Sequence, residues 1–200
     1  MELKLEEVLK NLNARGFVAK IFDTKEEAAA DMLANIGAEE TVGIGGSMSV
    51  DQTGIYDLLT ARGNTVHWHW KPHEGDVRRR ALLADVYLCS ANALTVDGDL
   101  VSIDGGGNRT SAMVYGPKRT FVVCGRNKLT ADIPAAIERI KNVACPQNAR
   151  RIGLPVPCAK TNHCHDCAAD IRMCRVTTIY SYPLRDREVR VYLVREDLGF

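Results

Sequence analysis

The hydrophobic positions of this chain alternate between two spacings. Apolar residues three and four apart, typical of amphipathic helices, recur in residues 5–12, 29–36, 55–59, 74–84 and 133–140. Between them lie short apolar runs typical of buried strands, at residues 17–22, 41–44, 65–70, 86–91 and 120–124. Because parallel strands need crossover connections, which are usually helices, the pattern predicts an α/β fold with an open, mainly parallel, doubly wound sheet.

Several of the predicted helices carry end signals. Thr24 and Glu27 have the spacing of a capping box at a helix start. Gly16, Gly37 and Gly63 stand where three apolar stripes stop, and glycine is a common residue just after a helix.

The pattern changes from Pro146 onward, where a short helix, two further prolines and a cysteine cluster follow. Residues 176–184 and 188–194 are then rich in β-forming side chains and are joined by the charged residues 185–187. These two runs predict a C-terminal antiparallel hairpin at an edge of the sheet.

Composition narrows the class of protein. The chain has 200 residues, 46% of them hydrophobic, which predicts a single domain over residues 1–200 with residues 145–175 as a cysteine-rich segment. The formal net charge is only +1, and no basic run is interleaved with aromatic residues, so nucleic acid is not an expected partner. No stretch has the length of a membrane span or the order of a signal peptide, so we expect a cytoplasmic protein that does not bind membranes.

Two glycine-rich loops are the main candidates for ligand binding. Residues 43–49 follow a predicted strand and precede a helix, an arrangement whose backbone N–H groups and hydroxyls favour an anion. The loop lacks the Gly-Lys-Ser/Thr ending of a P-loop and the third glycine of a dinucleotide fingerprint, and a tight strand-to-helix turn is the alternative interpretation.

The second loop, residues 104–111, contains three consecutive glycines after an Asp97-Gly98 turn. Ordering three glycines is entropically unfavourable, which suggests that the backbone must approach a ligand closely. Both loops should lie beyond the carboxyl ends of the strands and share one pocket. The predicted ligand-binding residues are Gly43, Gly45, Gly46, Ser47, Ser49, Asn92, Asp104, Gly105, Gly106, Asn108 and Arg109.

Individual side chains suggest roles but no catalytic residue can be named. Asp51 and Asp104 are the acids nearest the two loops, and Arg109 is the expected partner of an anionic ligand. His67 and His69 are two residues apart on one predicted strand, so their side chains point to the same face. The pair could bind a metal or act as a general base. The alternative is an ordinary polar strand face beside a cleft.

Residues 43–49, 84–98 and 104–109 together resemble the LUD domain of lactate utilization proteins, in particular the C type. The middle segment is also similar to a wider superfamily that includes ribose-5-phosphate isomerase, glucosamine-6-phosphate deaminase and CoA transferases. The resemblance implies a doubly wound sheet with a ligand crevice at these loops. It also implies a role in the oxidation of lactate or a related organic acid, alongside iron–sulfur partner proteins.

The cysteines suggest a metal centre. Cys158, Cys164, Cys167 and Cys174 are four soft ligands suited to an iron–sulfur cluster or zinc, and the electron-transfer setting implied by the resemblance favours a [4Fe–4S] cluster. Cys145 is a further candidate ligand. The alternative is a redox-active or inert set of thiols, with the Cys164–Cys167 pair as a thioredoxin-like motif.

The sequence therefore predicts a LUD-family protein of organic-acid metabolism that binds a small anionic metabolite and carries a cysteine-ligated metal centre for electron transfer. Two other functions stay open: a self-contained enzyme of the isomerase, transferase or cyclo-ligase kind, and a binding module stapled by zinc. The sequence decides neither whether the chain acts as an enzyme by itself or as a subunit, nor whether it forms a homo-oligomer.

Overall fold

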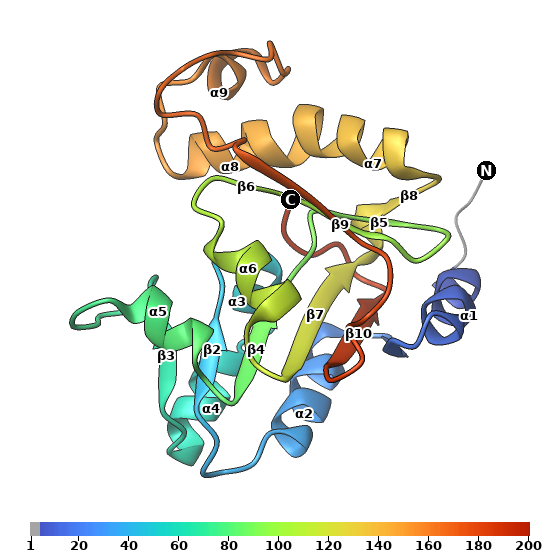
Figure 1. Cartoon of the computed structure of the whole chain (residues 1–200), viewed down its shortest axis with the longest axis vertical. Helices are drawn as coiled ribbons and strands as arrows, with labels where there is room; N and C mark the ends of the chain where they lie inside the picture. The colour runs from blue at the N-terminus through green and yellow to red at the C-terminus, as the bar shows by residue number, and fades with distance from the viewer. Residues whose placement is uncertain (1–4) are drawn as a thin grey trace.

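A computed structural model describes residues 5–200 of the chain. Its centre is a six-stranded sheet with the order β1-β10-β7-β4-β2-β3, in which every neighbouring pair is parallel (Figure 1). Its strands are β1 (Val18–Phe22), β2 (Val42–Ile44), β3 (Val66–Trp68), β4 (Val86–Cys89), β7 (Arg119–Gly125) and β10 (Glu188–Val194). The predicted mainly parallel α/β fold is confirmed.

Helices cover both faces of this sheet. They are α1 (Leu5–Ala14), α2 (Lys25–Asn35), α3 (Met48–Gln52), α4 (Ile55–Arg62), α5 (Val77–Leu82) and α6 (Asn108–Tyr115). One apolar core joins α1, α5 and α6 to one face, where Cys89 and Val122 point. A second core joins α2, α3 and α4 to the opposite face, where Leu88 and Phe121 point. The strands are continuous apolar runs because both of their faces are buried.

A smaller sheet lies beyond the carboxyl end of the large one. Its order is β8-β5-β6-β9, with β5 (Ala93–Thr95), β6 (Leu100–Asp104), β8 (Leu129–Thr130) and β9 (Val176–Tyr180). A third apolar core packs it against the long helical stretch α7 (Ile133–Arg139), η2 (Ile140–Ala144) and α8 (Cys145–Arg151). Figure 1 shows this layer above the large sheet, with α9 (Pro157–Thr161) beyond it.

The predicted C-terminal hairpin is wrong. β9 pairs antiparallel with β6 in the small sheet, whereas β10 lies inside the large sheet between β1 and β7. The charged residues 185–187 are therefore a connection between two sheets. The physical reason is burial: Val191 and Leu193 join one core and Tyr192 and Val194 join the other, as in a central parallel strand.

The structure contains the predicted helix-end signals, with small differences in position from those predicted. Gly16 and Gly63 have φ values of 92° and 99°, which favour glycine after a helix. The Thr24 hydroxyl accepts a hydrogen bond from the Glu27 N–H at 3.2 Å, while the Glu27 carboxylate accepts from the N–H of Asp23, one residue earlier than the predicted box requires.

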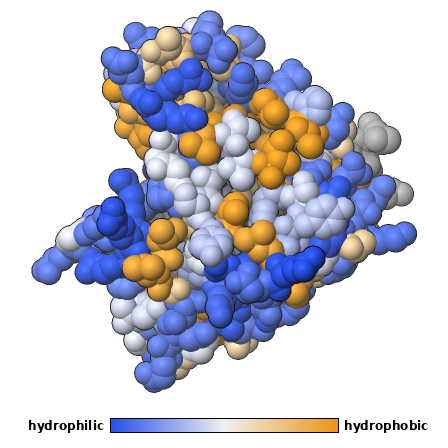
Figure 2. All heavy atoms as spheres, in the orientation of Figure 1, coloured by the Kyte–Doolittle hydropathy of each residue, from blue (hydrophilic) through white to orange (hydrophobic). Residues whose placement is uncertain are grey.

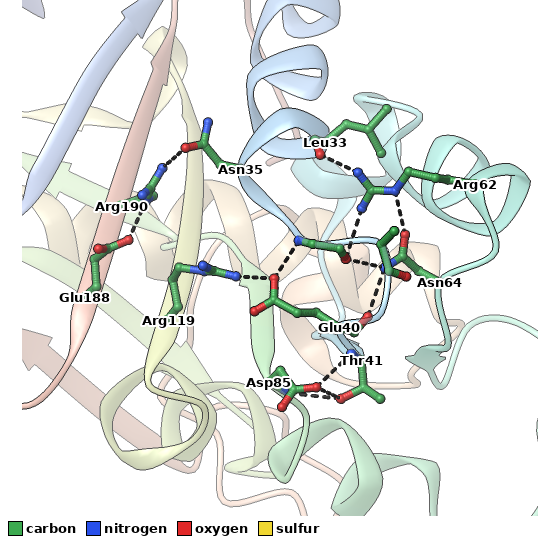
Figure 3. A network of polar contacts seen from close by, with 12 residues as sticks. Leu33, Asn35, Glu40, Thr41, Arg62, Asn64, Asp85, Arg119, Glu188 and Arg190 are labelled. Carbon is green, nitrogen blue, oxygen red and sulfur yellow. Dashed lines mark hydrogen bonds and ion pairs between the residues drawn. The ribbon is translucent and has the colours of Figure 1, made fainter.

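Polar pairs close the amino-terminal edge of the large sheet (Figure 3). The Asp85 carboxylate accepts hydrogen bonds from the N–H and hydroxyl of Thr41 at 2.8 and 2.7 Å, tying the start of β2 to that of β4. Arg119 at the start of β7 is paired with Glu40. These side chains are paired with one another at the amino-terminal edge. The candidate functional site lies at the opposite edge, where the strands have their carboxyl ends. Within residues 5–200, no helix combines the length and apolar character needed to cross a membrane.

Candidate functional site

A cavity of about 330 Å³ opens at the carboxyl-terminal edge of the large sheet. Segments that follow β2, β3, β4, β7 and β10 line it, and β6 and α8 contribute from the other layer. Figure 2 shows the surface indented between the part of the molecule that holds α8 and α9 and the part that holds α5. The volume is that of a site for a small metabolite.

The structure brings the two predicted glycine loops together on this cavity. The predicted ligand-binding residues that line it are Gly46, Ser47, Ser49, Asn92, Asp104, Gly105, Gly106, Asn108 and Arg109. The loops therefore form one pocket, as the strand order of an open α/β sheet favours. Ligand binding by these residues stays a prediction.

Gly43 and Gly45 do not line the cavity. A Cβ atom at Gly43 would lie 2.2 Å from the carbonyl oxygen of Ala81, so this glycine allows α5 to pack on β2. A Cβ atom at Gly45 would lie 2.8 Å from the hydroxyl of Tyr87. For these two positions, close packing explains the glycine, whereas Gly46 faces the cavity.

Asp104 organises the second loop. Its carboxylate accepts hydrogen bonds from the N–H groups of Gly106 and Gly107, both at 3.0 Å, and of Thr110 at 3.3 Å. Burial alone would raise the pKa of this carboxyl, but Arg109, 3.5 Å away, and these amides outweigh burial and lower the pKa. Asp104 is therefore an anion at neutral pH that holds the three-glycine turn in place.

Arg109 is largely committed to the protein itself. Its guanidinium donates hydrogen bonds to the carbonyl of Ser90 at 3.0 Å, to the side-chain oxygen of Asn92 at 2.9 Å and to the carbonyl of Ile103 at 3.0 Å. These bonds connect the segment after β4 to the end of β6. Arg109 lines the cavity as predicted, but most of its donors already have acceptors.

Lys128 is a cavity residue that sequence reasoning missed. It lies at the end of η1 (Arg126–Lys128), directly after β7, and only 3% of it is exposed. Its ammonium donates hydrogen bonds to the hydroxyls of Ser49 and Ser90, each at 2.7 Å, and to the carbonyl of Ala91 at 3.0 Å. The only signal in the sequence was its place shortly after a buried strand.

Two further cations, Arg78 and Arg151, stand at the mouth of the cavity. The Arg151 guanidinium lies 4.4 Å from the ring centroid of Trp70 and donates to the side-chain oxygen of Asn148 at 2.9 and 3.0 Å. Arg78 is exposed, and its guanidinium forms no hydrogen bond or ion pair with the part of the chain that the structure describes. Both guanidinium groups are available to a ligand entering the cavity.

The predicted histidine pair is divided between two environments. β3 ends at Trp68, so His69 belongs to the loop and lines the cavity, whereas His67 does not. Burial lowers the pKa of His69, and the nearby Arg78 lowers it further, which keeps this imidazole neutral at pH 7. Asp51 is exposed and does not line the cavity.

The cysteine-rich segment adjoins the cavity through Cys145. The sulfur atoms of Cys145 and Cys174 are 3.4 Å apart, and Cys145 lines the cavity wall. Burial raises the pKa of Cys158, and the nearby thiols of Cys174, Cys167 and Cys164 raise it further. Within residues 5–200, no three His, Cys, Asp or Glu side chains are arranged to hold a metal ion. The thiols gather in one region, but they do not form the ligand geometry of a metal centre.

Comparisons with known proteins address the fold and the family. No curated protein matches this chain. A DUF162 family protein from Deinococcus radiodurans has a similar crystal structure, with a TM-score of 0.53 and 14% sequence identity over 95% of each chain. The sequence signature of the LUD domain matches residues 5–194. With nearly its whole length matched in this way, the chain belongs to the LUD domain family.

Proposed function

We propose that the cavity binds a small anionic metabolite, and that the chain acts in the metabolism of lactate or a related organic acid. The observation that carries the proposal is the charge of the lining. Among the described side chains that line the cavity, Arg78, Arg109, Lys128 and Arg151 are cationic, and the one acidic side chain is Asp104, which Arg109 already neutralises. Three cations are thus left to an incoming anion. A recessed site of one charge sign also concentrates oppositely charged ligands.

Cavity size and hydrogen-bonding groups support a short carboxylic acid or a small phosphate compound. About 330 Å³ is at the small end of ligand sites. Hydroxyls and amides line it at Ser47, Asn92, Asn108 and Asn148, so the oxygen atoms of a polar metabolite would find partners. The volume leaves little room for a large ligand.

Calorimetric titration with L-lactate, pyruvate and inorganic phosphate tests the proposal. Arg151→Gln removes a cation at the mouth, and a charge-assisted hydrogen bond contributes about 1.5–3 kcal/mol, so affinity should fall by roughly tenfold or more. Arg150→Gln is the matched control, because Arg150 is an exposed neighbour that does not line the cavity. Failure of the wild-type protein to bind any of the three anions would overturn the proposal, as would equal losses in the two variants.

A metal centre in the cysteine-rich segment is the second proposal. The observation that favours it is the gathering of five thiols, Cys145, Cys158, Cys164, Cys167 and Cys174, whose charges act on one another. Thiolates of this number suit an iron–sulfur cluster or zinc, and either would require residues 158–174 to move into ligand geometry.

Anaerobic purification tests this second proposal. Iron with acid-labile sulfide would identify a cluster, and one zinc per chain would identify a structural site. Cys167→Ala should lose the metal while Cys89→Ala, which alters a thiol buried in the large sheet, should keep it. Metal-free, folded protein with freely reactive thiols would contradict the proposal. Lactate oxidation that depends on added iron–sulfur proteins would favour a subunit role, and turnover by the chain alone would favour a self-contained enzyme.

A further inference from the structure

Lys128 is a buried cation that has no carboxylate partner among residues 5–200. Buried charges in proteins are usually paired, because removing an ion from water is unfavourable. Arg109 obeys this rule through Asp104, but the three groups bonded to the Lys128 ammonium are all neutral: two hydroxyls and one carbonyl. The lysine is thus hydrogen-bonded but not neutralised by the described residues.

Two guanidinium groups near Lys128 add positive charge to its surroundings. The charged and titratable groups that face it are the thiols of Cys124 and Cys89 and the guanidinium groups of Arg139 and Arg109. Burial raises the pKa of Cys89 to about 12, so this thiol stays neutral at physiological pH. Burial, helped by Arg139 and Arg109 and opposed by the thiols of Cys124 and Cys89, lowers the pKa of Lys128 to about 8.

The floor of the cavity is built closely around this amine. The Ser49 hydroxyl accepts from Lys128 and donates to the carbonyl of Leu198 at 3.1 Å, and the Ser90 hydroxyl donates to the carbonyl of Ala91 at 2.9 Å. Gly199 passes so near that a Cβ atom there would lie 2.5 Å from the Ser49 hydroxyl oxygen and 3.5 Å from the Lys128 nitrogen. Three separate segments of the chain thus surround one lysine that lines the cavity.

We propose that Lys128 receives the anionic oxygen group of the ligand at the cavity floor, where the anion replaces one of its three neutral acceptors, and takes up a proton when the ligand binds. This inference rests on the proposed anion-binding function and names the residue that holds the charged end of the metabolite. The bound anion supplies the counter-charge that residues 5–200 do not provide to Lys128. Above pH 8, where much of the amine is neutral in the free protein, this proton comes from the solvent and converts the amine to an ammonium.

The direction of the pH dependence follows from linkage. An anion favours the protonated amine, so binding raises the pKa of Lys128 above its value in the free protein. Affinity should be constant below pH 8 and fall as the pH rises above it, with a limiting slope of about tenfold per pH unit. His69 also lines the cavity, but its pKa is lowered from 6.5. It therefore takes up a proton only at acidic pH and does not contribute to proton uptake above pH 8.

Calorimetry in buffers of different ionisation enthalpy measures this proton uptake directly. L-lactate and inorganic phosphate serve as probes, at about pH 7 and about pH 8.5. We expect the wild-type protein to take up a substantial fraction of a proton at the higher pH and much less at the lower pH. His69→Gln should leave the uptake at the higher pH unchanged.

Two variants separate a ligand-binding role from a structural one. Lys128→Met should weaken binding at least tenfold, whereas Lys128→Arg should keep binding but lose the proton uptake, because a guanidinium is always charged. Circular dichroism would check the fold of each variant. If a variant does not fold, the uptake by the wild-type protein still decides the question.

Anion binding by the wild-type protein without proton uptake at the higher pH would refute the role of Lys128 and leave the proposed cavity function intact. The same conclusion would follow if a folded Lys128→Met variant bound L-lactate or phosphate with unchanged affinity. Absence of binding at both pH values would overturn the proposed function and this inference together.

Discussion

At the scale of single residues, the two buried charges at the cavity are held in opposite ways. Asp104 has an arginine and three backbone amides around it, and these keep its carboxylate charged. Lys128 has only neutral acceptors. Asp104 therefore stabilises the folded chain itself, whereas the proposed role of Lys128 is to stabilise a bound anion.

Asp104→Asn should lower the free energy of unfolding by about 2 kcal/mol at neutral pH, because a buried carboxylate and its charge-assisted hydrogen bonds are lost. The lowered pKa of Asp104 means that its stabilisation is present above the pKa of an unfolded aspartate, about 3.9, and is lost as the pH falls through the lower folded value. Urea unfolding between neutral and acidic pH measures both effects. A difference between the two proteins that did not shrink in acid would contradict this account.

At the scale of elements, burial on both faces distinguishes β10 from β9. β10 is enclosed between β1 and β7, and its apolar side chains join both cores of the large sheet. β9 pairs with β6 and leaves Ile179 43% exposed. The two strands are neighbours in sequence, but they stabilise different layers of the molecule.

Val191→Ala in β10 should lower the free energy of unfolding by about 2 kcal/mol, because it removes buried methyl groups and leaves a void. Ile179→Ala in β9 removes more carbon but should have a much smaller effect, since its side chain is half in water. Chemical denaturation of both variants checks the comparison. Equal losses would argue against the central position of β10.

Thr24→Ala at the start of α2 should lower the free energy of unfolding by about 1 kcal/mol, because the Glu27 N–H loses its acceptor. Thr24→Ser retains a hydroxyl and provides the matched control. Thermal unfolding followed by circular dichroism measures the change. An alanine variant as stable as the serine variant would show that this cap contributes nothing.

At the scale of the whole molecule, the cavity depends on two layers meeting. The large sheet contributes the loops after its strands, and the small sheet with α8 contributes the facing wall. A ligand held between them should stabilise the folded chain as a unit, because it binds the native state and not the unfolded one.

A saturating anion, at about one hundred times its dissociation constant, should therefore add about 2.7 kcal/mol to the free energy of unfolding. Thermal unfolding at increasing concentrations of L-lactate or phosphate measures the shift, with chloride at matched ionic strength as the control. At the same anion concentration, Arg151→Gln should show a smaller shift than Arg150→Gln. A midpoint that responds only to ionic strength would contradict site-specific binding.

Much of the fold and part of the site could be predicted from local pattern. The alternation of amphipathic helical stripes and apolar runs reflects which faces of the helices and strands are buried. It therefore predicted the α/β class and most of the helices and strands. Gly46 and Asp104 could be placed near one another because ligand sites in such sheets form where strands end. Gly43 shows where prediction from the sequence fails, because a glycine needed for close packing cannot be distinguished by sequence from a glycine that binds a ligand.

The amino-acid sequence by itself determined the periodicity, the helix ends and the family signature, because these depend on residues close together in the chain. Only the tertiary structure decided that β10 enters the large sheet, that the sulfur atoms of Cys145 and Cys174 lie 3.4 Å apart, and that Lys128 lies buried beside Ser49 and Ser90. The physical reason is distance along the chain: Lys128 and Ser49 are 79 positions apart. The spacing of residues along the chain cannot predict such a hydrogen bond, because the bond forms only after the two sheets and their helices have packed together.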